Sequence, residues 1–131
     1  MAARATGGGQ ATILICEDEP SLRDLMRISL GDGYVVAEAG DGEQAIELAR
    51  DLRPDLVLLD LMLPGCSGLE VLRRLRAEPR TWGTPVVIVT AFAGTAERQE
   101  AEAAGADGFI AKPFDPAELT ATVEELLARG R

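Results

Sequence analysis

The sequence predicts an α/β fold, a doubly wound five-stranded parallel sheet with helices on both faces. Five short apolar runs are rich in Val and Ile, and most lack the period-two alternation of half-exposed strands. Such runs are typical of strands that are covered on both faces. An amphipathic segment with helical spacing follows each run. Strand and helix therefore alternate five times, and 131 residues suffice for one domain with one core.

The first two strand–helix units account for the first part of the chain. Their strands are the runs at residues 12–16 and 34–39. Apolar side chains share one face of each following helix, namely Leu22, Leu25, Met26 and Leu30 in the first, and Ala45, Leu48, Ala49 and Leu52 in the second. Gly31 and Gly33 mark the end of the first helix, and Asp41 with Gln44 resembles a capping box at the start of the second.

The remaining three units follow the same pattern. Their strands are the runs at residues 55–60, 85–90 and 108–111. Ser67 with Glu70 resembles a capping box, and Asp115 precedes a proline at the first position of the last helix. The third helix is expected to bury the face with Gly68, Leu72 and Leu75. The fifth is expected to bury the face with Leu119, Val123, Leu126 and Leu127. The fourth, at roughly 95–104, offers only alanines, so we expect it to pack shallowly.

Composition narrows the classes of function. The net charge of −9 argues against nucleic acid or an anionic membrane as a direct partner. No apolar run approaches the roughly 20 residues of a membrane span, and the first ten residues read as a flexible tail without a signal peptide. Two cysteines, Cys16 and Cys66, do not make a secreted disulfide framework, so a cytoplasmic setting is expected. No second domain, linker or output segment is visible.

Charged and polar residues follow the strands where ligands bind in doubly wound sheets, beyond the carboxyl ends. Glu17 and Asp18 follow the first strand, Asp60 ends the third, and Thr90 ends the fourth. Lys112, the only lysine beside twelve arginines, follows the fifth. If the first and third strands are neighbours, the three acids converge and would repel one another unless a cation joins them.

That convergence has a specific chemical meaning. A hard divalent ion such as Mg²⁺, or Mn²⁺, binds carboxylates together with waters and phosphate oxygens. A lysine and a hydroxyl beside the metal suit the oxygens of a transferred phosphoryl group. Asp60 would then be the nucleophile that forms an acyl phosphate. Taken singly, each residue has an ordinary structural explanation, and only their joint placement favours this chemistry.

The motifs "ILICEDEP", "LLDLMLPG", "VIVTA" and "IAKPF" resemble the receiver domains of two-component response regulators, the CheY-like proteins. The resemblance implies strand order 2-1-3-4-5, a flexible tail at 1–10 and a receiver domain over residues 11–129. It implies that Asp60 is the phosphoacceptor, with Lys112 and Thr90 as its catalytic partners. Glu17, Asp18, Asp60 and the backbone carbonyl of Met62 would bind the metal.

Further roles also come from the resemblance alone. Thr90 and Phe109 would be the switch residues, although Phe109 lacks the hydroxyl of the more frequent tyrosine. The family usually holds the peptide between Lys112 and Pro113 in the cis form. Met62 and Phe92 would flank the path of the water that hydrolyses the acyl phosphate. Neither can orient a water, which predicts a phosphorylated state that outlasts the seconds scale.

The resemblance implies a signalling domain rather than an enzyme, one that catalyses only its own phosphorylation and dephosphorylation. Its donor would be a histidine kinase or a histidine phosphotransferase, and its output protein is not readable. Gly108 and Thr122 stand where the winged-helix regulators often carry charges, which favours a monomer or a weak phosphorylation-dependent dimer. The main alternative is a pseudo-receiver that only binds proteins. A dehalogenase-type phosphatase would need an acidic residue two positions after the nucleophile, where this chain has Met62. An FMN carrier would need a phosphate-binding loop after the first strand, and the acidic sequence "EDEPS" there would repel a phosphate.

Overall fold

The computed structural model describes residues 9–129 and contains five strands and five helices in alternation. In chain order they are β1 (Ala11–Cys16), α2 (Pro20–Leu30), β2 (Tyr34–Ala39), α3 (Gly42–Leu52), β3 (Leu56–Leu59), α4 (Gly68–Ala77), β4 (Val86–Thr90), α5 (Thr95–Ala103), β5 (Gly108–Ala111) and α6 (Pro116–Ala128). The predicted flexible tail at 1–10 falls almost wholly outside the described residues.

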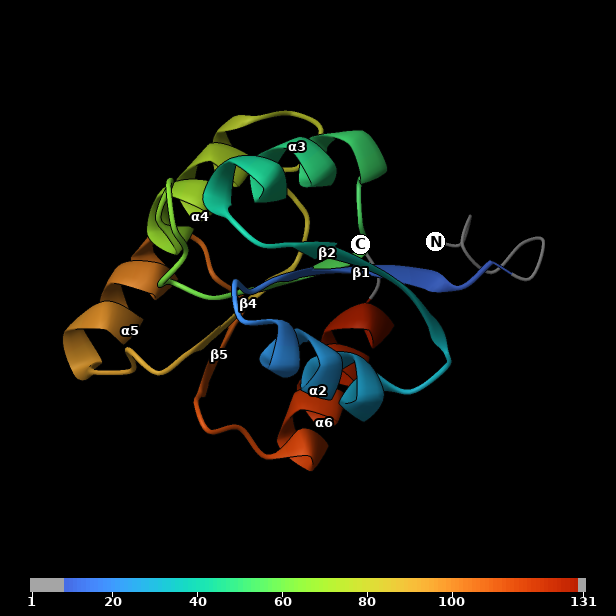
Figure 1. Cartoon of the computed structure of the whole chain (residues 1–131). Coiled ribbons are helices and arrows are strands. Elements are labelled where there is room, and N and C mark those ends of the chain that lie inside the picture. The colour runs from blue at the N-terminus through green and yellow to red at the C-terminus, as the bar shows by residue number, and fades with distance from the viewer. Residues whose placement is uncertain (1–8, 130–131) are drawn as a thin grey trace.

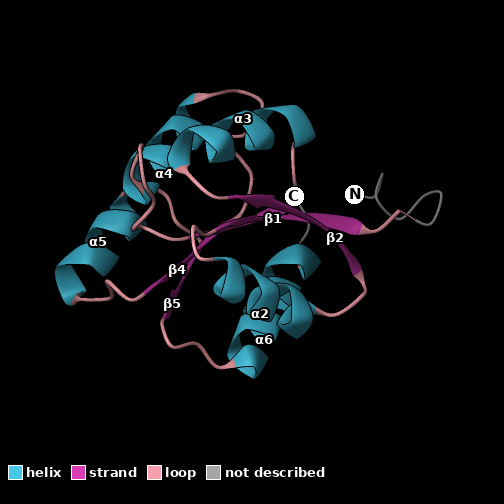
Figure 2. Ribbon diagram, in the orientation of Figure 1, coloured by secondary structure: helices cyan, strands magenta, loops and turns pink. Residues whose placement is uncertain are grey.

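All the strands run parallel in one sheet with the order β2-β1-β3-β4-β5, which confirms the predicted fold class and strand order. Figure 1 shows α3, α4 and α5 on one face of the sheet and α2 and α6 on the other. Figure 2 shows the same layers, with the strands between the two groups of helices. The chain moves outward from β1 to β2 through α2 and outward from β3 to β4 through α4, in opposite directions along the sheet, so a crevice opens beyond the carboxyl ends of β1 and β3.

Each face of the sheet has its own apolar core. One core joins β1, β3 and β4 to α3 and α4, with Ala101 as the contribution of α5. The other joins the opposite faces of the same strands to α2 and α6. Ala101 is the buried residue of α5, and no side chain caps the start of that helix. The shallow packing expected for the fourth helix is therefore present.

The helix ends agree with the predicted caps in most places. The side chains of Asp41, Ser67 and Asp115 accept backbone N–H groups of α3, α4 and α6, respectively. The Gln44 side chain accepts the N–H of Gly40, one residue before the cap, instead of closing the expected capping box. Gly31 ends α2 with φ 81°.

Two predicted burials are wrong. Leu25 and Leu52 were expected on the buried faces of their helices, but they are 42% and 45% exposed. The buried residues of these helices are Met26 and Leu30 in α2, and Gly42, Ala45, Ile46 and Ala49 in α3. The strands also differ slightly from the predicted runs, since β3 stops at Leu59 and leaves Asp60 beyond its end.

Candidate phosphoacceptor and metal site

The candidate site lies where four strands end at the same edge of the sheet. Glu17 follows β1, Asp60 follows β3, Thr90 is the last residue of β4, and Lys112 follows β5. Backbone hydrogen bonds continue past the strand ends, from Asp60 N–H to the Cys16 carbonyl at 3.1 Å and from Lys112 N–H to the Thr90 carbonyl at 2.9 Å. The sheet itself therefore fixes the separations between these residues.

Three carboxylates meet at this edge. Glu17, Asp18 and Asp60 each offer an oxygen, and these oxygens all lie within 4.8 Å of one another. Glu17 and Asp60 are buried, with exposed fractions of 1% and 4%, whereas Asp18 is exposed. Buried carboxylates at this spacing repel one another unless cations compensate for their charge.

Lys112 supplies part of that compensation. Its Nζ donates to Glu17 Oε1 at 2.6 Å and to Asp60 Oδ2 at 2.7 Å, so a single ammonium bridges two of the three acids. The Lys112 side chain is 13% exposed, which leaves the bridge only partly shielded from water. Charge-assisted hydrogen bonds of this length are about twice as strong as neutral ones.

The environment moves the pKa values of the bridged groups in different directions. Burial raises the pKa of Glu17 above its usual range, and the bonds from Lys112 and the Glu19 N–H offset only part of that rise. Burial also tends to raise the pKa of Asp60, but hydrogen bonds from Lys112, the Met62 N–H and Thr90 outweigh it, so the pKa is lowered. For Lys112, burial favours the neutral amine, yet the two carboxylates raise its pKa overall. Asp60 is thus held ionised.

Asp60 is also fixed in position by its own loop. Its Oδ1 accepts the N–H of Met62 at 3.0 Å, while the Met62 side chain points outward and is 58% exposed. Thr90 is fully buried and helps to lower the pKa of Asp60, and its hydroxyl accepts the N–H of Phe92 at 3.2 Å. Met62 and Phe92, both half exposed, therefore lie on the two loops that hold the carboxylate.

Gly68 allows the loop after Asp60 to approach α4 closely. A Cβ at this position would stand 2.1 Å from the Asp60 carbonyl oxygen and 2.6 Å from Leu61 Cα. The Gly68 N–H donates to the Leu61 carbonyl at 3.0 Å. Helical spacing predicts only that Gly68 lies on a helix face, not that it touches the loop after Asp60. A glycine placed directly after a serine cap, where a better helix former would serve, was the available signal.

Phe109 lies beside the site on β5, half-buried against the core of α3 and α4. The guanidinium carbon of Arg98 on α5 stands 5.2 Å from the centre of its ring, which is cation–π range. The peptide bond between Lys112 and Pro113 is cis. All the residues predicted for the site thus lie at one edge of the sheet or directly beside it.

The donor set fits a hard divalent cation. Carboxylate oxygens, with the backbone carbonyl of Met62 nearby in the chain, are the ligands that Mg²⁺ and Mn²⁺ take in proteins. Glu17 and Asp60 are buried, and Asp18 is exposed on the solvent side of the cluster. Histidine is absent from the chain, and Cys16 and Cys66 are both free thiols, with Cys16 buried in the core.

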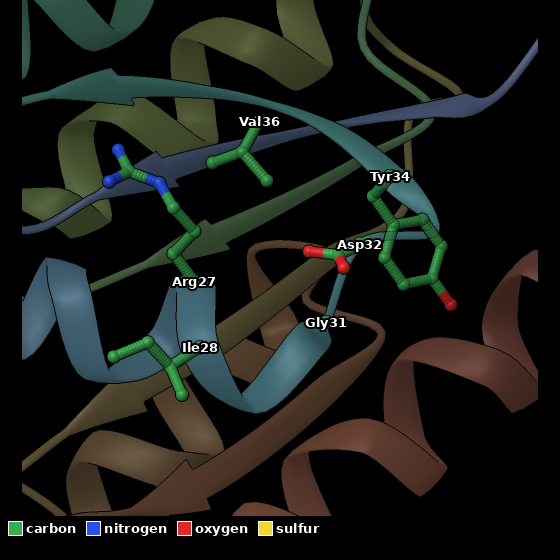
Figure 3. A pocket seen from close by; sticks show the side chains of 6 residues that line it. All are labelled: Arg27, Ile28, Gly31, Asp32, Tyr34 and Val36. Atoms are coloured by element: carbon green, nitrogen blue, oxygen red, sulfur yellow. The ribbon is translucent and has the colours of Figure 1, made fainter.

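A separate pocket of about 600 Å³ lies between α2 and the edge strand β2 (Figure 3). Its lining residues are Arg27, Ile28, Gly31, Asp32, Tyr34 and Val36. These residues belong to the end of α2 and the start of β2, so the pocket lies near the amino end of the edge strand, whereas Asp60 follows the carboxyl end of the central strand β3. It contains none of the clustered acids. Among the described residues, no helix is long and apolar enough to cross a bilayer.

Sequence comparison relates the chain to known signalling proteins. A family model for the response regulator receiver domain matches residues 13–124. The chain is 48% identical over 119 residues to the DNA-binding response regulator MtrA of Mycolicibacterium smegmatis, covering 90% of this chain and 51% of that protein. It is 43% identical over 118 residues to the DNA-binding dual master transcriptional regulator RpaA of Synechocystis, covering 89% and 49%. The chain spans about half the length of the curated relatives it matches.

Solved structures of response regulators have the same fold as this chain. A putative response regulator from Chloroflexus aurantiacus superimposes with a TM-score of 0.86 at 33% identity, covering 91% of this chain and 98% of that one. The receiver domain of the Francisella response regulator 1452 gives 0.85 at 27% identity, covering 93% and 100%.

Proposed function

This chain belongs to the response regulator receiver family of two-component systems, and from that premise we propose that Asp60 is its phosphoacceptor. The observation that carries the proposal is the bridge from Lys112 Nζ to Asp60 Oδ2 and Glu17 Oε1, beside a third carboxylate. An ion pair that served stability alone would need one carboxylate for one ammonium, whereas here a single lysine stands beside three carboxylates. A phosphoryl site does need one nucleophilic carboxylate, a cation-binding pair and an ammonium.

The reaction is an exchange of one bond to phosphorus for another. An Asp60 carboxylate oxygen attacks the phosphorus of a phosphohistidine on the donor. The O–P bond forms as the P–N bond breaks, and the imidazole leaves with the bonding electron pair and takes up a proton. Lys112 remains an ammonium throughout, because its pKa is raised, and it pairs with the added phosphoryl oxygens. The lowered pKa of Asp60 keeps the attacking oxygen unprotonated.

The proposed metal ligands are Glu17, Asp18, Asp60 and the Met62 carbonyl, and the proposed ion is Mg²⁺ or Mn²⁺. When bound, such an ion neutralises charge on the transferred phosphoryl oxygens. Glu17 is one methylene longer than aspartate. In this structure that length lets its carboxylate reach Lys112 and the Glu19 N–H at the same time.

The proposed switch uses Thr90 and Phe109. Thr90 lies close enough to Asp60 to help lower its pKa, so its hydroxyl would move toward a phosphoryl group on Asp60 and bond to it. Phe109 would follow into the space behind it, releasing the contact with Arg98 and shifting α5. The face formed by α5, β5 and α6 would therefore change.

NMR spectra test the switch directly. Phosphorylation should move resonances across residues 91–110, and Arg98→Gln should move the unphosphorylated spectrum part of the way in the same direction. A cation–π contact at an exposed site is worth about 0.5–1 kcal/mol, so the shift in population is about two- to five-fold. Changes confined to the Asp60 pocket would contradict the switch.

The wider setting is proposed on the same basis. The donor is a histidine kinase or histidine phosphotransferase of the cytoplasm, and the chain catalyses only its own phosphorylation and dephosphorylation. Relatives named as DNA-binding regulators suggest a transcriptional output. The net charge of −9 makes the receiver itself a poor DNA ligand, so contact with DNA would fall to other sequence. We expect a monomer or a weak phosphorylation-dependent dimer.

Small phosphodonors discriminate this function from a protein-binding pseudo-receiver. Incubation with acetyl phosphate and Mg²⁺ should add about 80 Da, the mass of one phosphoryl group, to the intact protein. Chelation with EDTA should prevent the addition. A protein that folds and binds Mg²⁺ but gains no mass would favour the pseudo-receiver.

A further inference from the structure

Arg23 on α2 contacts the backbone of Glu17 from outside the acidic cluster. Its Nη1 donates to the Glu17 carbonyl oxygen at 2.6 Å. From this contact we propose that Arg23 is a positioning residue that orients Glu17 for metal binding. The inference rests on the proposed metal site and assigns a role to a residue outside it.

The Glu17 carbonyl needs such a partner because the sheet ends there. The carbonyl before it, on Cys16, accepts the N–H of Asp60 from β3. The Glu17 N–H still donates to the Ala39 carbonyl of β2 at 3.0 Å. Beyond that point the guanidinium of Arg23 takes the place of a strand partner. The two peptide units on either side of the Glu17 Cα are thus both held, the first by the sheet and the second by Arg23.

Arg23 is itself held in place. Its Nε donates to Glu38 Oε1 at 3.1 Å, and its side chain is only 20% exposed. Glu38, near the end of β2, also pairs with Arg27 one turn further along α2. In Figure 3 the Arg27 side chain extends from α2 toward β2. Arg23 therefore connects three elements, because it joins α2 and the edge strand to the residue that follows β1.

The position of Arg23 in its helix also points to a role beyond helix stability. It lies in the first turn of α2, where a positive side chain works against the helix dipole. The N-cap of that helix is Glu19, whose N–H donates to Glu17 Oε2 at 3.1 Å. The start of α2 thus holds Glu17 twice, at its carbonyl through Arg23 and at its carboxylate through Glu19. Both bonds define the direction of a side chain that is 1% exposed.

Electrostatics and positioning predict opposite results when Arg23 is neutralised. Removing a positive charge near three carboxylates should by itself strengthen the binding of a divalent cation. Losing the bond that orients a ligand should weaken it, about ten-fold or more on the scale seen for partners of metal ligands. Arg27 offers a matched control, because it pairs with the same Glu38 and carries the same charge, but its ion pairs in the described part of the chain are with Glu38 and Asp24.

The experiment measures the Kd for Mg²⁺ by calorimetry on the full chain, and the unfolding free energy without metal, for wild type, Arg23→Gln and Arg27→Gln. We expect both variants to lose some stability. Only Arg23→Gln should bind Mg²⁺ about ten-fold more weakly. Arg23→Lys, which keeps a charge and one donor, should recover part of the affinity and also serves if the glutamine variant does not fold.

Three results would overturn the proposal. Unchanged or tighter Mg²⁺ binding by Arg23→Gln, or by Arg23→Lys if only that variant folds, would mean that the bond does not orient Glu17. Equal weakening in the Arg23 and Arg27 glutamine variants would mean that the whole Glu38 cluster acts through stability. Wild type that binds no Mg²⁺ at all would refute the metal site itself, and with it this role.

Discussion

Replacing Lys112 with methionine removes the ammonium that bridges Glu17 and Asp60 and keeps an unbranched apolar side chain that is one atom shorter. At an effective dielectric constant near 20, unit charges 2.7 Å apart attract by about 6 kcal/mol. Desolvation of the ions offsets much of that attraction, and removing one partner of a buried pair typically costs about 3–5 kcal/mol. Lys112 is 13% exposed and Asp18 is exposed, so solvent screens the pair in part and we expect a loss of about 2–3 kcal/mol of unfolding free energy at pH 7 without metal.

The loss of unfolding free energy caused by Lys112→Met should become smaller as the pH falls. In wild type the raised pKa of Lys112 means that its stabilisation is complete below about pH 10, the usual range for lysine. The lowered pKa of Asp60 adds stability above about pH 4 that disappears as the pH falls through the folded pKa. In the variant the pKa values of Glu17 and Asp60 should both rise above their unfolded values, so acidification relieves their repulsion. The difference in unfolding free energy between wild type and Lys112→Met should therefore become smaller from pH 7 toward pH 4.

Urea unfolding at several pH values without metal measures this gap. A matched variant is Arg50→Met, which breaks the half-exposed pair with Glu78 and should cost less than about 1 kcal/mol. Mg²⁺ should restore part of the stability of Lys112→Met by neutralising the acids. A gap that stays constant or widens on acidification would refute the reasoning, as would a loss no larger than that of the control.

Two other predictions concern the loops around the acceptor. The double variant Met62→Asn, Phe92→Glu should lose its acyl phosphate about ten-fold faster than wild type once the phosphodonor is removed, because polar groups can orient the attacking water. Decay of the wild-type phosphate within seconds, or an unchanged decay rate in the variant, would contradict this prediction. Gly68→Ala should lower the unfolding free energy by about 2 kcal/mol or more, because its Cβ would stand 2.1 Å from the Asp60 carbonyl oxygen. A denaturant unfolding curve that superimposes on that of wild type would count against this close approach.

The sheet was predictable because its strands are short unbroken Val and Ile runs and its helices carry caps with known chemistry. The same logic predicted the site, since parallel strands bring the residues after their carboxyl ends to one edge. Periodicity could not predict that Leu25 and Leu52 would be exposed, because the extent of each helix that the sheet covers is a tertiary property. Nor could it predict that Arg53 would end α3 in the left-handed conformation, at φ 47°, where glycine is usual.

The contacts that tune the site were also beyond sequence reasoning. Lys112 was expected to face Asp60, but its second bond, to Glu17, joins residues 95 positions apart and depends on the reach of the longer acid. Arg23 gave no signal either, because a surface-type arginine in a helix is common and its acceptor is a backbone carbonyl. The Lys112 contact depends on how the ends of β1 and β5 are placed, and the Arg23 contact on how α2 packs against the sheet, and no local pattern encodes either.

The most direct test of the account is the location of the phosphoryl group. Wild type, Asp60→Asn and the remote surface variant Asp24→Asn are treated with acetyl phosphate and Mg²⁺, and the modified peptide is mapped by mass spectrometry. The account predicts one added phosphoryl group on the peptide that contains Asp60 in wild type and Asp24→Asn, and none in Asp60→Asn. Undiminished labelling of a folded Asp60→Asn, or a phosphoryl group mapped to another residue in wild type, would contradict it.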